Sequence, residues 1–122
     1  MINAAELRMS IAIDYLYAKV KQDDIERFQK EITILSAWLD HSVGKDVHYN
    51  NRGCVYIGLR NYINAIDDFT SGILLNSSQA LYYINRAIVF LHTQEIRSAF
   101  NDIYIARELT ASDPRHLSAL LK

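Results

Sequence analysis

The sequence predicts an all-α protein built as an array of antiparallel helix hairpins. Two observations lead to this fold class: apolar residues recur every three or four positions, and part of the chain repeats itself after 34 residues. Spacings of three and four place side chains on one face of an α-helix, and no segment keeps the alternation of two that a strand requires. With 122 residues, the chain is long enough for one domain with a core of its own.

The first part of the chain predicts one helix pair that turns around Gln22 and Asp23. An apolar helical pattern runs from Ala4 to about Lys21, and a second helix follows it. One stripe of that second helix carries Ile25, Phe28, Ile32, Leu35 and Leu39. Acidic residues open the stripe, where negative charge suits a helix N-terminus. Residues 42–45 then break the pattern and are typical of a linker.

Four further helices are expected, and a short fifth one closes the sequence. Their ranges are near 46–59, 62–75, 80–92 and 95–109, followed by 114–121. Asp113 and Pro114 form a good helix start, because a capping side chain precedes a proline at the first helical position.

Self-comparison gives the strongest evidence for a repeat. A shift of 34 residues lays 46–79 over 80–113 without a gap and matches eight identical positions. The identical pairs are Tyr49 and Tyr83, Asn51 and Asn85, Arg52 and Arg86, Val55 and Val89, Ala65 and Ala99, Asp68 and Asp102, Leu75 and Leu109, and Ser78 and Ser112. Such a unit cannot bury its apolar face alone, so stacking on its neighbours completes the core.

Small residues mark where the two helices of each unit cross. Gly53 is matched by Ala87, and Ala65 is matched by Ala99. A large side chain at these places would push the helices apart, so we expect close helix contacts there. Larger side chains are expected to fill the surrounding space: Tyr56, Phe69, Phe90 and Ile103.

The repeat resembles the tetratricopeptide repeat family. The resemblance rests on the 34-residue period, on Tyr-Asn-Asn-Arg-Gly-Cys-Val-Tyr at 49–56, and on Asn-Tyr-Ile-Asn-Ala-Ile-Asp-Asp-Phe at 61–69. It implies a right-handed array of about three helix pairs in a single domain, 1–122. Its parts would be a degenerate hairpin (1–45), two repeat units (46–79 and 80–113) and a short capping helix (114–122).

The resemblance also implies a concave groove, lined by the first helix of each repeat, that binds peptides. The candidate partner-binding residues are Asn50, Asn51, Cys54 and Ile57, and Leu81, Ile84, Asn85, Ile88 and His92. Asn51 and Asn85 stand out, because an amide both donates and accepts and can therefore bind a peptide backbone. In the alternative interpretation these asparagines only accompany Arg52 and Arg86, which would be exposed or paired with acidic residues.

The eight tyrosines offer another candidate surface, because tyrosine is favoured at protein interfaces. Tyr49, Tyr56, Tyr62 and Tyr83 fall at core positions of the repeat. Tyr82 must point elsewhere on its helix than Tyr83, so Tyr82 is the better interface candidate.

Enzymatic chemistry finds little support. No nucleophile elbow, phosphate loop, zinc-protease motif or nucleotide fingerprint is present, and we expect no cofactor and no metal site. Arg86 and His92 on one helix resemble a pair used by all-α ribonucleases, which leaves that activity as a remote alternative. Cys54 is the one cysteine, so it cannot form an internal disulfide, and it most simply fills a small position in the groove.

Charge and hydropathy narrow the partners. Thirteen basic and fourteen acidic residues give no excess that would favour nucleic acid. The apolar runs are too short to span a bilayer, and the N-terminus lacks the pattern of a signal peptide, so a cytoplasmic location is expected.

The sequence therefore predicts a non-catalytic adaptor or chaperone that binds a peptide or helix of a protein partner. A secretion chaperone, a pilus-assembly factor and a toxin-immunity protein are the roles considered. The alternative is a homodimeric scaffold subunit that assembles through its helical ends, where Leu117, Leu120 and Leu121 are candidates.

Overall fold

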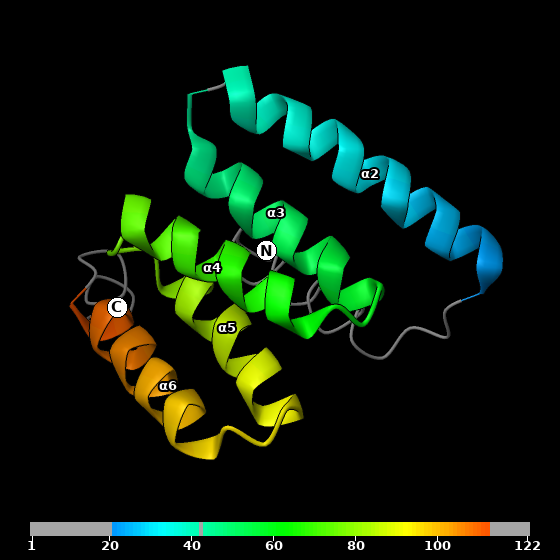
Figure 1. Cartoon of the computed structure of the whole chain (residues 1–122). Helices are drawn as coiled ribbons and strands as arrows, with labels where there is room; N and C mark the ends of the chain where they lie inside the picture. The colour runs from blue at the N-terminus through cyan, green and yellow to red at the C-terminus, as the bar shows by residue number, and fades with distance from the viewer. Residues whose placement is uncertain (1–20, 42, 113–122) are drawn as a thin grey trace, which may run out of the picture.

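The computed structural model describes residues 21–41 and 43–112, which form five α-helices joined by short turns (Figure 1). The helices are α2 (Gln22–His41), α3 (Lys45–Gly58), α4 (Tyr62–Leu75), α5 (Ala80–His92) and α6 (Ile96–Ala111). No strand occurs within these ranges, which confirms the all-α prediction. The bounds of α3 to α6 agree with the predicted helices to within two residues. The helices predicted at 4–21 and 114–121 lie outside the described residues.

The two repeat units end their first helices with the same turn. Arg60 and Gln94, which are 34 positions apart, both adopt the left-handed backbone conformation, with φ of 60° and 65°. In each turn the next residue donates a backbone hydrogen bond back to the helix, from Asn61 to Tyr56 and from Glu95 to Phe90. This bond closes the last helical turn and reverses the chain, so the repeat seen in sequence is also a repeat of backbone geometry.

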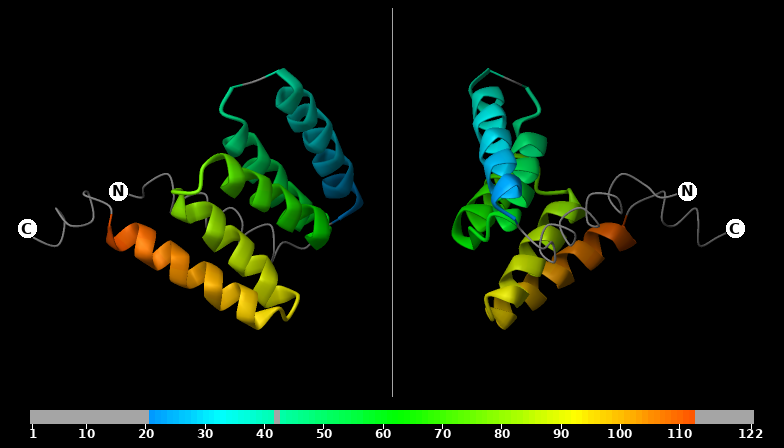
Figure 2. Two further views of the ribbon diagram at one scale, coloured as in Figure 1. Left: turned by 60° about the vertical axis from the view of Figure 1, so that its left-hand side comes forward. Right: turned by 90° about the vertical axis from the view of Figure 1, so that its right-hand side faces the viewer.

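The helices pack in chain order, each beside the next, as the views in Figure 2 show. Helix α3 also contacts α5, whereas α2, α4 and α6 make no contacts with one another in the described part of the chain. The first helices of the two units therefore converge, and the second helices diverge. This difference places α3 and α5 together on one side of the array. No helix in the described ranges is both long and apolar enough to cross a membrane.

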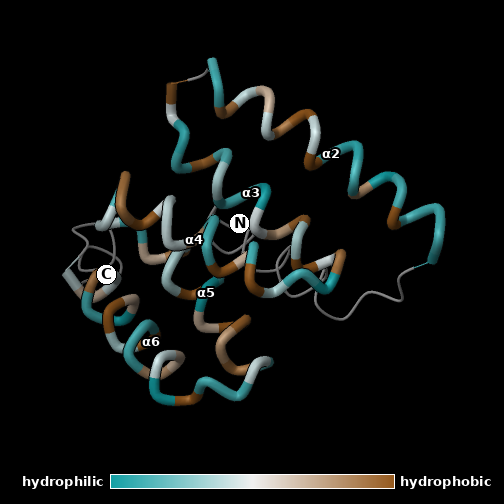
Figure 3. Tube along the Cα trace, in the orientation of Figure 1, coloured by the Kyte–Doolittle hydropathy of each residue, from teal (hydrophilic) through white to brown (hydrophobic). Residues whose placement is uncertain are grey.

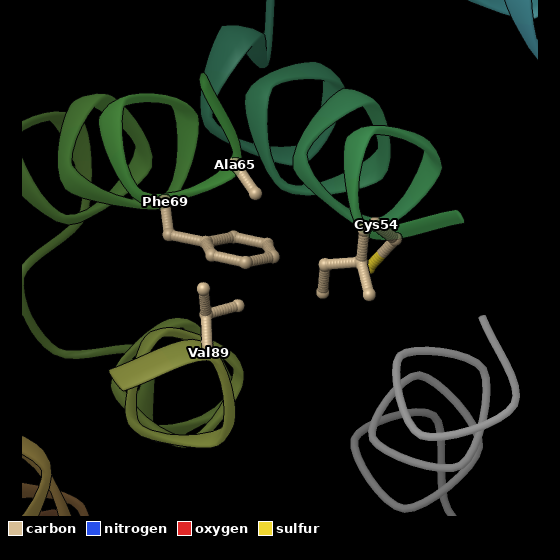
Figure 4. Close-up of a cluster of buried hydrophobic side chains, with 5 residues drawn as sticks. Cys54, Ala65, Phe69 and Val89 are labelled. Carbon is tan, nitrogen blue, oxygen red and sulfur yellow. The ribbon is translucent and has the colours of Figure 1, made fainter. Parts of the chain in front are cut away.

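The closest helix crossing lies between α3 and α4. The ring of Phe69 projects from α4 into a cluster with Cys54, Ala65 and Val89 (Figure 4). A Cβ atom added at Gly53 would come within 2.6 Å of Cε1 of Phe69. Glycine is therefore needed there for helix contact, as the sequence predicts.

Helix α6 has a less covered apolar surface than α4. Each helix carries both hydrophobic and hydrophilic stretches along its length (Figure 3), but Ile103 is 42% exposed, whereas its repeat counterpart Phe69 is fully buried. The expectation that Ile103 fills space around the helix crossing is wrong. The reason is that α4 lies between α3 and α5, whereas α5 is the only described helix that packs on α6.

Candidate functional site on helices α3 and α5

Two arginines on these helices are held by identical sets of contacts. Arg52 on α3 donates two hydrogen bonds to the carboxylate of Asp68 on α4, at 2.8 and 2.7 Å, and a third to Oγ of Ser36 on α2 at 3.0 Å. Arg86 on α5 does the same with Asp102 on α6 and with Oγ1 of Thr70 on α4. We call each set an arginine clasp: an arginine, a carboxylate from the same hairpin and a hydroxyl from the preceding helix.

The clasps explain the repeated arginines as structural residues. Each guanidinium also lies within 6 Å of two aromatic rings, those of Tyr49 and Tyr56 around Arg52 and those of Tyr83 and Phe90 around Arg86. This confirms the alternative in which the arginines are paired with acidic residues.

Both clasp carboxylates are nearly inaccessible to water. The side chain of Asp68 is 6% exposed and that of Asp102 is 1% exposed. Burial raises the pKa of Asp68, and the hydrogen bonds from Arg52 act in the opposite direction. A charge buried to this degree requires its partner, because an unpaired carboxylate in such a place is strongly destabilising.

The predicted site residues separate into three groups by exposure. The buried ones are Asn50, Cys54, Ile57, Leu81, Tyr82 and Asn85. Ile84 and Ile88 are half-buried, and Asn51 and His92 are exposed. Excluding Tyr82, which packs elsewhere, the predicted residues on the two helices form what we call the α3–α5 face.

The structure pairs Asn85 with Asn50. Nδ2 of Asn85 donates a hydrogen bond to Oδ1 of Asn50 at 2.7 Å, between side chains that are 0% and 1% exposed. The repeat register aligns Asn85 with Asn51, but Asn51 lies on the exposed side of α3. The two helices are therefore offset by one residue at this contact.

The asparagine pair has two polar atoms without a partner. Nδ2 of Asn50 and Oδ1 of Asn85 are buried and make no hydrogen bond. If both amides were turned over, the two side chains would exchange roles, and one donor and one acceptor would still remain unused. Leaving such a group buried and unpaired costs about 1–3 kcal/mol. A polypeptide backbone presents one N–H and one C=O per residue, which are the groups that these two atoms lack.

Tyr82 lies in the interior of the array. Its hydroxyl donates a hydrogen bond to Oδ2 of Asp46 at 2.6 Å, and Nδ2 of Asn76 donates to the same oxygen at 3.4 Å. The bond from Tyr82 lowers the pKa of Asp46 below its usual value. Packing and this hydrogen bond account for Tyr82, and contact with a partner at this residue stays a prediction.

The residues weighed for catalysis are engaged in structural contacts. The guanidinium of Arg86 is held in its clasp, and the ring of His92 lies 4.6 Å from that of Tyr62. Cys54 is 4% exposed and belongs to the hydrophobic cluster beside Phe69. Within the described residues, His, Cys, Asp and Glu side chains do not gather in threes as a metal site would require.

A small hydroxyl on α2 was a signal that the sequence comparison missed. Ser36 and Thr70 are 34 positions apart and play the same role in the two clasps. The repeat therefore extends into the segment before residue 45, where the aromatic and small signature residues are missing. A search for Ser or Thr sixteen positions before each repeated arginine would have found it.

Comparison with protein-family models and with curated protein sequences finds no match. Solved structures do match. PcrH from Pseudomonas aeruginosa has a TM-score of 0.68 and 17% identity over 95% of this chain and 84% of that one. PcrH in complex with the chaperone-binding region of PopB has the same score and identity over 94% of this chain and 89% of that one. The second tetratricopeptide repeat domain of Spaghetti (RPAP3), bound to the HSP90 peptide SRMEEVD, has a TM-score of 0.60 and 21% identity, covering 86% and 91%. The chain therefore has a tetratricopeptide-repeat-like fold.

Proposed function

We propose that this protein is a non-catalytic adaptor or chaperone whose α3–α5 face binds an extended segment of a partner protein. The observation that carries the proposal is the asparagine pair, with one unused donor on Asn50 and one unused acceptor on Asn85. Two hydrogen bonds to a peptide unit would remove the cost of leaving both atoms unpaired.

The partner segment is expected to be apolar or amphipathic. Around the asparagine pair, the partly accessible side chains of the face are Val47 on α3 and Ile84 and Ile88 on α5. They supply hydrocarbon surface and no charge. Because the amides address the backbone, the apolar rim would select among partner segments.

The matching structures support the same class of function. One holds the chaperone-binding region of PopB and another holds an HSP90 peptide, so both folds were captured with a segment of another protein. Among the roles expected from the sequence, that of a cytoplasmic chaperone agrees best with these neighbours. Which protein it serves is decided by experiment.

The experiment compares partner capture by two variants. Tagged wild-type protein is used to recover partners from the host, and the recovered segment is then titrated as a synthetic peptide. We expect Asn50→Ala with Asn85→Ala to weaken peptide binding about tenfold or more, because two hydrogen bonds are lost at about 1 kcal/mol each. Circular dichroism verifies that the variant is folded.

Asn51→Ala provides the matched control, since Asn51 is the exposed neighbour on the same helix. It should bind the peptide as the wild type does. Unchanged affinity in the Asn50 and Asn85 double variant would refute the assignment of the face. Loss of binding with Asn51→Ala alone would restore the pairing read from the repeat register.

A homodimeric scaffold is the second candidate, favoured by what we call the α6 stripe: Ile96, Phe100 and Ile103. These side chains are 45%, 62% and 42% exposed. Their counterparts on α4 all pack in the core cluster that includes Val89 of α5. The stripe is thus the surface on which a further helix would stack, and a second copy of the chain could supply it.

Light scattering during size-exclusion chromatography tests this candidate. A scaffold should be a dimer that Phe100→Asp converts to a monomer, because a carboxylate in an apolar interface loses its hydration without gaining a partner. Wild-type protein that stays monomeric at all concentrations measured would exclude the dimer.

A further inference from the structure

A second concave surface lies away from the α3–α5 face. It is a hollow of about 390 Å³ between the first half of α4 and the end of α5. Phe90 lines it, two positions after Ile88, so it points to the opposite side of α5 from the proposed peptide-binding face. The hollow is at the small end of ligand-binding cavities, which suits one long side chain better than a cofactor.

The walls of the hollow are apolar and aromatic. Helix α4 contributes Tyr62, Ile63 and Ile66, and α5 contributes Phe90. Ile63 is 77% exposed, so this wall is open to a ligand from outside. The ring of Tyr62 is held in place by its contact with His92.

Two carboxylates border the hollow, one on each side. Asp67 follows Ile66 on α4, and Glu95 stands in the turn between α5 and α6. Oε2 of Glu95 accepts a hydrogen bond from Oγ1 of Thr93 at 3.0 Å, which fixes its position. Neither carboxylate forms an ion pair with a described residue. The nearest cation, Arg86 beside Phe90, is already neutralised by Asp102.

This combination of surfaces selects the chemistry of the ligand. An anion would be repelled by both carboxylates, and a purely apolar group would strip water from them without compensation. A cation on a hydrocarbon stem satisfies both requirements, because the stem covers the apolar wall and the charge lies between the carboxylates.

The chain already uses the same chemistry for its own arginines. In each clasp a guanidinium binds a carboxylate and lies within 6 Å of two aromatic rings. Guanidinium is planar, stacks on rings and carries five N–H donors, so it can bridge two separate carboxylates better than an ammonium group. We propose that the hollow bordered by Asp67 and Glu95 binds an arginine side chain of a partner protein. This site is independent of the proposed peptide-binding face.

The test uses two small probes on the full chain at pH 7.5. N-acetyl-arginine methylamide is titrated and followed by ¹⁵N–¹H correlation spectra, and N-acetyl-citrulline methylamide serves as the neutral probe of the same shape. We expect saturable shifts at the backbone amides of Ile63, Asp67 and Glu95, with a dissociation constant on the order of 1 mM. The citrulline probe should bind about fivefold more weakly or worse, because its head group is uncharged.

Variants separate the site from general attraction between charges. Asp67→Asn with Glu95→Gln should weaken the arginine probe about fivefold. Glu26→Gln with Asp40→Asn, which removes two exposed carboxylates from α2, should leave binding unchanged. Equal binding of both probes, shifts outside the hollow only, or equal weakening by the two double variants would each overturn the proposal.

Discussion

At the scale of single residues, two adjacent tyrosines show how polar groups are accommodated in the core. Tyr82 and Tyr83 are both buried, and each hydroxyl has an acceptor. Tyr82 donates to the carboxylate of Asp46, and Tyr83 donates to the backbone carbonyl of Ser77 at 2.9 Å. One acceptor titrates and the other does not, so the two residues can be compared directly.

Tyr82→Phe should destabilise the protein in a pH-dependent way. The hydrogen bond lowers the pKa of Asp46 from 3.8, so the folded protein keeps this carboxylate charged at lower pH than the unfolded chain does. The stabilisation is complete above the unfolded pKa and is lost as the pH falls through the folded pKa. We expect the substitution to cost about 1–2 kcal/mol at pH 7 and less at pH 3, measured by urea unfolding.

Tyr83→Phe is the matched control, because its acceptor is a backbone carbonyl. Its cost should be the same at both pH values. If the costs of the two substitutions change equally between pH 7 and pH 3, the bond to Asp46 is not the source of the pH dependence.

At the scale of helices, the two hairpins combine different residues at equivalent positions. The first hairpin has Gly53 and Phe69, and the second has Ala87 and Ile103 at the same places. The smallest residue accompanies the larger ring, which lies so close that a Cβ at Gly53 would overlap it. Helix contact is thus set by the pair of residues.

Gly53→Ala should therefore be destabilising, although alanine favours helices. Overpacking a buried ring costs about 1–3 kcal/mol, and the gain in helix propensity offsets up to about 1 kcal/mol of it. In a Phe69→Ile background, which reproduces the second hairpin, the same change should cost less. Urea unfolding of the four proteins in this cycle measures the coupling, and strictly additive costs would contradict it.

The helices could be predicted from sequence because their signal is local. The spacing of apolar residues fixed α4 and α5 to the residue, and the turns follow the 34-residue period. Contacts between helices carry no such local signal. The meeting of Asn85 with Asn50 depends on an offset of one residue between α3 and α5, and the burial of Tyr82 depends on Asp46, 36 positions earlier.

At the scale of the whole molecule, the array is supported unevenly. Helix α4 packs against two described neighbours, α3 and α5, whereas α6 packs against α5 alone and leaves its stripe exposed. In arrays of repeats, stability is close to a sum of each unit and its interfaces with neighbours. An element with one interface should open more often than one with two.

Hydrogen exchange followed by mass spectrometry should show this difference. Backbone amides of α6 are expected to exchange faster than those of α4, because local opening costs less where fewer apolar contacts are lost. The α4 peptides serve as the internal reference in the same sample. Equal protection of the two helices would mean that the α6 stripe is covered in solution, which would favour the dimer.

The arginine clasps have a consequence for how such a chain can change in length. Each repeat supplies an arginine and a carboxylate for its own hairpin, and its second helix supplies the hydroxyl, Ser36 or Thr70, that the next arginine needs. Insertion or loss of material would keep every clasp intact only in whole multiples of 34 residues. The next position in the series is Tyr104, a bulky ring beneath Arg107 where a small hydroxyl stood before. A further unit would have to join this array through a different contact.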